Sequence, residues 1–287
     1  MHAPRNPGAA SAGGENPFIV FSHANSFPAG TYRVLFDDLR RRGFELSAVE
    51  RFGHEPAYPV TNNWPHLVEQ LIAHVRSLQA GSPRKVCLVG HSLGGFLSLM
   101  AAARAPELAA CVLLIDSPVL GGWRAGALGL AKRTQLVGSI SPGRVSRHRR
   151  EQWDSRKAAL EHFRHKKAFA RWQGEVLEDY IASGLSDTKE GKCRLSFERE
   201  IETAIYNTLP DNLDAWLRRH PLQCPVGFVG GIQSEEMRRV GFAMTERLVK
   251  GRVMMLEGSH LFPMEKPFAT AAAIEASLRG MTGRPSA

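Results

Sequence analysis

The sequence predicts an α/β fold, in which a mostly parallel β-sheet carries helices on both faces and is interrupted by a mainly helical insertion. Short apolar runs alternate with amphipathic segments over residues 17–117 and again over 222–287. This alternation is typical of parallel strands joined by covering helices. Residues 118–221, between the two parts, show no convincing strand pattern and are expected to form a helical cap. The chain has 287 residues, 43% of them hydrophobic, which is enough for one large core.

The first part of the predicted core alternates strand and helix from its beginning. Residues 1–16 are rich in Gly, Ala and Pro and are expected to be a disordered tail. The expected strands are 17–22, 44–49, 86–89 and 110–115. The expected helices are 32–43, 64–78 and 96–104. The helix over 32–43, for example, places Tyr32, Leu35, Phe36 and Leu39 on one face, because these residues recur at a spacing of three and four.

The alternation resumes after the insertion. We expect strands at 225–230 and 253–256 and helices at 235–249 and about 265–279. All strands would then be parallel, and the insertion would lie over their carboxyl ends, where ligands bind in open α/β sheets.

Composition excludes several classes of protein. No apolar run approaches the roughly 18 to 20 residues of a membrane span, and the N-terminal stretch lacks the apolar core of a secretory signal. The four cysteines have no metal-type spacing, so we expect reduced thiols, no metal site and a cytoplasmic location. No phosphate loop or dinucleotide fingerprint accompanies the strands, and no cofactor is expected. The oligomeric state is not predicted.

Positive charge is concentrated in the insertion. The net charge is +9, and residues 118–172 hold 13 Lys or Arg against 3 Asp or Glu, an excess of ten. A solvated basic face is the simplest interpretation, and attraction of an anionic substrate, an acidic carrier protein or a membrane surface is the alternative. Nucleic-acid binding is not expected, because the interleaved aromatic residues have the spacing of an amphipathic helix that packs on the core.

The most informative stretch is Gly90-His91-Ser92-Leu93-Gly94, which lies between a predicted strand and a predicted helix. In a Gly-x-Ser-x-Gly turn the small flanking residues let the serine stand exposed at the edge of the sheet. The backbone N–H of Leu93, at the start of the helix, would point toward an oxyanion formed on a substrate attacked by Ser92. Ser92 is therefore the candidate nucleophile.

A serine hydroxyl needs a base within hydrogen-bond reach, and histidine is the natural choice at neutral pH. His260 is the best candidate of the eleven histidines, because it lies in a loop directly after the last predicted strand. We expect His23 to brace the loop after the first strand, and His91 to pack or hydrogen-bond near the turn; neither is expected to act as the base.

Three motifs resemble the α/β-hydrolase superfamily in its esterase- and lipase-like branch. These are His23-Ala24-Asn25, similar to the oxyanion loop of the family, the turn around Ser92, and Gly258-Ser259-His260, similar to the loop of its catalytic histidine. The resemblance implies that Ser92 attacks, that His260 transfers the proton, and that the backbone N–H groups of Asn25 and Leu93 hold the oxyanion.

The acid of the expected triad departs from the family pattern. The loop that usually supplies an aspartate, after strand 225–230, contains no aspartate. We select Glu235 in this loop, since glutamate can serve the same role. Asp116, at the end of strand 110–115, is the alternative acid. Ser234 is expected at most to orient a neighbouring group, because it cannot stabilise an imidazolium as an anion does.

The sequence therefore predicts a serine hydrolase that cleaves a carboxylic ester through an acyl-enzyme intermediate. A thioesterase acting on acyl-CoA or acyl-carrier substrates is one alternative, and a carbon–carbon bond hydrolase would use the same triad. A non-catalytic ligand-binding protein on a hydrolase fold is a further alternative, supported by the unusual acid loop. The substrate is expected to be a small acyl ester or thioester, whose acyl and alcohol groups the sequence does not identify.

Overall fold

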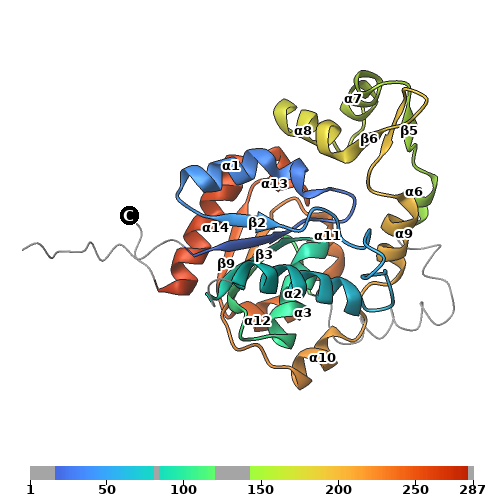
Figure 1. Cartoon of the computed structure of the whole chain (residues 1–287). Coiled ribbons are helices and arrows are strands. Elements are labelled where there is room, and N and C mark those ends of the chain that lie inside the picture. The colour runs from blue at the N-terminus through green and yellow to red at the C-terminus, as the bar shows by residue number, and fades with distance from the viewer. Residues whose placement is uncertain (1–16, 81–83, 120–142, 284–287) are drawn as a thin grey trace, which may run out of the picture.

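A computed structural model describes residues 17–80, 84–119 and 143–283 (Figure 1). Its centre is a six-stranded sheet in the order β2-β1-β3-β4-β8-β9, with every neighbouring pair parallel. The strands are β1 (Ile19–Ser22), β2 (Leu46–Ala48), β3 (Val86–His91), β4 (Ala109–Ile115), β8 (Val226–Gly231) and β9 (Val253–Leu256). The predicted fold class is confirmed, whereas the predicted tail 1–16 lies outside the described residues.

Helices cover both faces of the sheet because side chains alternate along each strand. In β1, Ile19 and Phe21 face one core cluster, and Val20 faces the other. The first cluster includes side chains of η1 (Ala29–Tyr32), α1 (Arg33–Arg41) and α14 (Pro267–Thr282). The second includes side chains of α2 (Pro65–Gln79), α3 (Leu93–Arg104) and α12 (Ala243–Val249). The inner strands β1, β3, β4 and β8 are thus buried on both sides, whereas the edge strands β2 and β9 are partly exposed.

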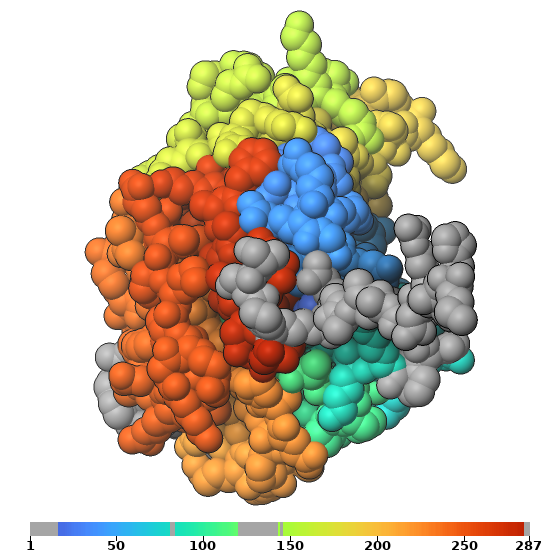
Figure 2. All heavy atoms as spheres, turned by 90° about the vertical axis from the view of Figure 1, so that its left-hand side faces the viewer, coloured from blue at the N-terminus to red at the C-terminus, as the bar shows by residue number. Residues whose placement is uncertain are grey.

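The two ends of the described chain meet on the same face of the sheet. Helix α1 lies beside α14, and Figure 2 shows the two in contact below the insertion. Arg42, just after α1, donates to Glu275 of α14 at 2.8 Å. This packing joins the last helix of the core to the first.

The insertion between β4 and β8 is mainly helical, as expected, but it also contains a small sheet. Its described elements are α6 (Gly143–His148), β5 (Gln152–Trp153), α7 (Arg156–Arg164), α8 (Gly174–Gly184), β6 (Leu185–Asp187), β7 (Cys193–Leu195), α9 (Arg199–Asn207) and α10 (Leu213–Arg219). Strands β5, β7 and β6 pair antiparallel. The sequence did not reveal them because two or three residues are too few to show alternation.

The insertion is tied to the core beside the loop that follows β1. Helix α8 packs against η1. The Arg33 guanidinium donates to Asp179 at 2.7 Å and to Glu175 at 2.6 Å, both on α8. The division into a core at 17–117 and 222–287 and a cap at 118–221 stays a prediction, and residues 120–142 of that cap lie outside the described part.

Two predicted helices have different bounds in the structure. The helix expected over 235–249 is two helices, α11 (Glu235–Val240) and α12, because Gly241 adopts a φ of 82° and ends α11. The helix expected from 265 is preceded by a short separate turn, α13 (Phe262–Glu265), and α14 begins at Pro267. Among the described helices, none has the length and apolar character needed to cross a bilayer.

The space around two glycines, one in the turn after β3 and one in α14, predicts opposite effects of a Gly→Ala substitution on stability. A Cβ at Gly94 would overlap the backbone carbonyl of Ser22, whereas a Cβ at Gly280, within α14, meets nothing within 4 Å. We expect Gly94→Ala to lower the free energy of unfolding by about 1–3 kcal/mol and Gly280→Ala to raise it by about 0.4–1 kcal/mol. Urea unfolding measures both, and an unchanged Gly94→Ala protein would contradict the close approach of β1 to α3.

Candidate active site

Ser92 occupies a strained turn between β3 and α3. Its φ of 53° and ψ of −115° lie in a region that side chains rarely adopt. The turn is held because Ser92 N–H donates to Ile115 O at 3.0 Å and Gly95 N–H donates to Ser92 O at 3.0 Å. Gly90 and Gly94 are required here, since a Cβ on either would overlap backbone atoms of the neighbouring elements. The side chain of Ser92 consequently stands at the carboxyl end of β3.

Three side chains from three loops form a continuous hydrogen-bonded line. Ser92 Oγ lies 3.0 Å from His260 Nε2, and His260 Nδ1 lies 2.6 Å from Asp116 Oδ2. Because a carboxylate only accepts, the His260 Nδ1–H donates to Asp116, which leaves Nε2 unprotonated and able to accept from the Ser92 hydroxyl. This tautomer is the one that a general base facing a serine requires.

The Asp116 carboxylate is completely buried, and its hydrogen bonds compensate for its burial. Oδ1 accepts from the backbone N–H of Gly231 at 2.8 Å, and Oδ2 accepts from Ser234 Oγ at 2.5 Å in addition to His260. The residue adopts a φ of 44°, which aspartate tolerates better than most side chains. Ser234 thus orients the acid, the role that the sequence allowed for it.

Glu235, the acid selected from the sequence, does not meet His260 in the structure. Its carboxylate accepts from Arg239 at 2.7 Å on the exposed side of α11. Ser234 caps α11, and its Oγ accepts from the N–H of Met237 at 3.2 Å. Glu235 is therefore a first-turn residue of a surface helix, a position that the helix dipole favours for a negative charge. The alternative acid Asp116 is the one that contacts His260.

The neighbouring residue Glu236, which the sequence analysis did not select, does approach the histidine. Its Oε2 lies 3.8 Å from His260 Nδ1, and its side chain is 46% exposed. Burial lowers the pKa of His260, but the Asp116 hydrogen bond and the charges of Glu236 and Asp116 outweigh it, so that the pKa is raised above 6.5. A pair of adjacent glutamates gave no sequence signal to show which one faces inward.

The two backbone N–H groups expected to hold an oxyanion belong to Leu93 and Asn25. Leu93 begins α3, and Asn25 follows β1; among the described residues no group accepts a hydrogen bond from either N–H. Asn25 is buried, and its side-chain Nδ2 donates to Glu202 O in α9 at 3.1 Å, which fixes the loop to the insertion. The arrangement leaves two donors from adjacent elements available for an oxyanion.

A buried chain of hydrogen bonds positions these loops relative to one another. His91 Nε2–H donates to the backbone carbonyl of His260 at 2.9 Å, so that His91 Nδ1 accepts from the Tyr32 hydroxyl at 2.8 Å. Tyr32 Oη in turn accepts from Ala24 N–H at 3.0 Å. The turn before Ser92, the His260 loop and the loop of Asn25 are thereby connected.

His23 completes this chain from the other side. Phe52 N–H donates to its Nε2 at 3.1 Å, so the proton lies on Nδ1 and is donated to Ala24 O at 2.8 Å. The Ala24 carbonyl belongs to the same peptide unit as the Asn25 N–H, and fixing one end of that unit fixes the direction of the other. The bracing role predicted for His23 and the contacts expected for His91 agree with this geometry, whereas Tyr32 carried no signal beyond its place on a helix face.

A second buried carboxylate shapes the loop of His260. Glu265 Oε2 accepts from Ser259 N–H at 3.1 Å and its Oε1 accepts from Ser259 Oγ at 2.5 Å. Arg171 of the insertion pairs with Glu265 at 3.3 Å. The loop therefore depends on both the core and the insertion for its conformation.

A metal ion would have one place to bind among the described residues. Ligand atoms of Asp116, Glu236 and His260 lie within 4.8 Å of one another. In the observed hydrogen-bond arrangement His260 Nδ1 carries a proton and points at Asp116, so it has no lone pair for a metal. The three side chains suit proton transfer better than coordination.

The contacts of His260 predict how its pKa responds to substitution. Removing the hydrogen-bonded anion in Asp116→Asn should lower the pKa of His260, and Glu236→Gln should lower it less, because that carboxylate is more distant and half-exposed. Glu235→Gln, which removes a charge from the next residue, should leave it unchanged. Titration of the His260 ring by NMR measures all three, and a fall in Glu235→Gln equal to that in Asp116→Asn would contradict the observed geometry.

The burial of His23 predicts a loss of stability in acid. Burial lowers its pKa from 6.5 to about 4. The unfolded chain therefore binds a proton between pH 6.5 and 4 that the folded protein does not, and the free energy of unfolding should fall across this window by about 3 kcal/mol. His23→Gln should remove that part of the pH dependence, whereas the exposed His66→Gln should retain it. Equal slopes in urea unfolding against pH for both variants would refute a neutral, buried His23.

Comparison with known proteins agrees with this architecture. The family model described as "Alpha/beta hydrolase family" matches residues 19–273. Monoglyceride lipase of Rattus norvegicus is 31% identical over 135 residues, which are 46% of this chain and 45% of that protein. The chain thus matches less than half the length of that relative.

Solved structures match over nearly the whole chain. E-2-(acetamidomethylene)succinate hydrolase is 23% identical, covers 92% of both chains and gives a TM-score of 0.67. A thioesterase domain from the curacin biosynthetic pathway is 18% identical, covers 91% of both chains and gives a TM-score of 0.66. Because the sequence identities are below 25%, these two matches show a shared fold and no more. Since the family model spans most of the sequence, the chain belongs to the alpha/beta hydrolase family.

Proposed function

We propose that this protein is a serine hydrolase that cleaves a carboxylic ester through a Ser92–His260–Asp116 triad. The observation that carries the proposal is the line of hydrogen bonds from Asp116 through His260 to Ser92, in the tautomer that base catalysis needs. The ester class is supported by the similarity to monoglyceride lipase, whose name describes an ester hydrolase. The proposal replaces Glu235 by Asp116 as the acid.

In the first half of the reaction, Ser92 Oγ attacks the ester carbonyl and its proton passes to His260 Nε2. The carbonyl oxygen becomes an oxyanion, which accepts from the N–H groups of Asn25 and Leu93. Asp116 stabilises the imidazolium by charge and by the Nδ1–H hydrogen bond. When the C–O bond breaks, the alcohol leaves with the proton from His260, and the acyl group stays on Ser92.

In the second half, His260 Nε2 takes a proton from a water molecule that attacks the acyl-enzyme. The second tetrahedral intermediate collapses to the free acid, and His260 returns the proton to Ser92 Oγ. The raised pKa of His260 has a consequence here, because only the neutral ring accepts a proton. The acidic limb of the rate profile should therefore lie above pH 6.5 in the wild type.

Two of the other functions compatible with the sequence can be weighed against the structure. A non-catalytic binding protein was supported by the absence of an aspartate in the usual acid loop, and Asp116 now fills the position next to His260. A thioesterase is favoured by a specific observation, the basic pocket described below, and by the fold shared with a thioesterase domain. It would use the same acyl-enzyme steps with a thiolate as leaving group.

The cysteines are the basis for a proposal about the cellular compartment of the protein. All four cysteines are free thiols, three of them buried. We infer a cytoplasmic protein, because reducing compartments preserve free thiols.

The proposed triad predicts graded losses of activity. Ser92→Ala should abolish labelling by a fluorophosphonate probe and hydrolysis of para-nitrophenyl esters. Asp116→Asn should retain the serine but lower kcat/KM by about a thousandfold or more, because the histidine loses its orienting anion. Glu235→Gln is the matched control and should keep wild-type kcat/KM.

The outcomes separate the candidate functions. Labelling that persists in Ser92→Ala would contradict the assignment of Ser92 as the nucleophile. A loss of kcat/KM in Glu235→Gln as large as in Asp116→Asn would favour Glu235 as the acid. Hydrolysis of acyl-CoA with little hydrolysis of oxygen esters would favour the thioesterase. Wild-type protein that neither labels nor hydrolyses any acyl substrate would favour the binding protein.

A further inference from the structure

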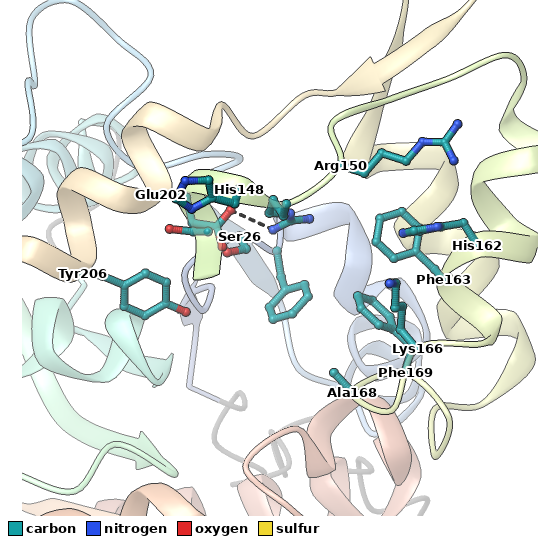
Figure 3. A pocket seen from close by; sticks show the side chains of 13 residues that line it. Ser26, His148, Arg150, His162, Phe163, Lys166, Ala168, Phe169, Glu202 and Tyr206 are labelled. Carbon is teal, nitrogen blue, oxygen red and sulfur yellow. Dashed lines mark hydrogen bonds and ion pairs between the residues drawn. The ribbon is translucent and has the colours of Figure 1, made fainter. Parts of the chain in front are cut away.

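A cavity of about 720 Å³ lies between the loop after β1 and the insertion (Figure 3). Ser26, which lines it, directly follows Asn25, the proposed oxyanion donor. Glu202 of α9 also lines it, and its carbonyl accepts from Asn25 Nδ2. The cavity therefore adjoins the loop that carries the proposed oxyanion donor.

The wall of the cavity on the insertion side is apolar and aromatic. Phe27 of the core lies 6.3 Å from Phe169 between ring centroids, and Phe169 lies 4.9 Å from Phe163. Figure 3 shows the rings of Phe163 and Phe169 on the side of the pocket opposite Tyr206. Such a wall accommodates an alkyl or aryl body.

Charge in the cavity is predominantly positive. Its one carboxylate, Glu202, is already paired with Arg149 at 2.7 Å, and Arg149 also donates to Tyr180 at 2.9 Å. Two further cations, Arg150 and Lys166, line the same space, and no carboxylate among the described residues pairs with either. Residues 120–142, outside the described part, contain no Asp or Glu in their sequence.

Neighbouring groups respond to this positive charge. Burial lowers the pKa of His162, and the charges of Lys166, Arg150 and Arg149 lower it further. His162 also lines the cavity. Arg150 is held in place because its Nε donates to Gln152 O at 2.8 Å and its guanidinium lies over the Trp153 ring. Among the residues that the structure describes, no group accepts a hydrogen bond from its remaining N–H groups, which leaves them for an anion.

We propose that this cavity selects substrates that carry an anionic group on an apolar body, held by Arg150 and Lys166. The proposal rests on the proposed hydrolase function and names its substrate class. The anion could be a carboxylate on the acyl chain or a phosphate on the leaving group, as in coenzyme A, because both chemistries suit two unpaired cations. The acyl chain of a neutral ester would pack against the apolar wall, but the ester would offer no negative charge to these two cations.

The test compares esters that differ only in one charge. Wild-type protein should hydrolyse mono-para-nitrophenyl adipate with a kcat/KM about tenfold above that for para-nitrophenyl hexanoate, which has the same number of carbons in its acyl chain. Raising the salt concentration from about 0.02 to about 0.5 M should reduce this preference. The double charge reversal Arg150→Glu with Lys166→Glu should abolish it through a loss of kcat/KM for the adipate ester.

The matched control reverses two neighbouring cations that do not line the cavity, Arg147→Glu with Lys167→Glu. It makes the same change in net charge and should retain the preference. Hexanoyl-CoA distinguishes the two sources of the anion. If the charge reversal lowers its turnover and not that of the adipate ester, the cations bind the phosphates of the leaving group.

Binding to Ser92→Ala separates this proposal from the proposed function. Calorimetry should show mono-para-nitrophenyl adipate or coenzyme A binding more tightly than the uncharged para-nitrophenyl hexanoate, and the charge reversal should remove that difference. If no ester is hydrolysed but this binding pattern holds, the hydrolase function fails and the anion site stands. Hydrolysis of both esters at equal rates, with no effect of salt or of the charge reversal, would overturn the anion site and leave the hydrolase function intact. Equal losses in the test and control pairs would also overturn it.

Discussion

The buried carboxylate of Asp116 is the constraint on which the site depends. A fully buried anion is costly unless donors surround it, and here the donors come from three separate places. Gly231 ends β8, Ser234 begins α11, and His260 lies in the loop after β9. Satisfying one carboxylate at the end of β4 therefore fixes the relative positions of two loops, one after β8 and one after β9, that are more than a hundred residues away in sequence. The proposed base is held in reach of Ser92 as a result.

A second constraint joins the other half of the site. The chain from the His260 carbonyl through His91 and Tyr32 to Ala24, and from there to His23, has one consistent set of proton positions. Each donor has a single acceptor that suits it, so the network specifies the geometry of the loops. The side chains of His23, Tyr32 and His91 in this chain are buried. They act by holding the Asn25 peptide and the His260 loop against the same turn.

The predictable parts of this protein are those set by local sequence. The turn at Ser92 follows from its glycines, and the parallel sheet follows from apolar runs such as 86–89, because both depend on neighbouring residues. The acid could not be chosen in this way, since Asp116 and Glu235 lie at the ends of adjacent strands and only the three-dimensional path of the loops decides which reaches His260. Strands β5 to β7 and the break at Gly241 were missed because they depend on tertiary contacts and on one backbone torsion.

In the proposed complex, the two kinds of charge around the site would act on opposite ends of the substrate. Asp116 and Glu236 place negative charge beside His260, whereas Arg150 and Lys166 place positive charge on the insertion side of the cavity. An anionic substrate would be repelled by the first pair and attracted by the second, so only one orientation satisfies both. That orientation brings the uncharged carbonyl to Ser92 and keeps the anion away from the carboxylates that raise the pKa of His260. If the proposed anionic substrate is correct, the basic residues of the insertion and the acidic residues of the core would act together to orient it.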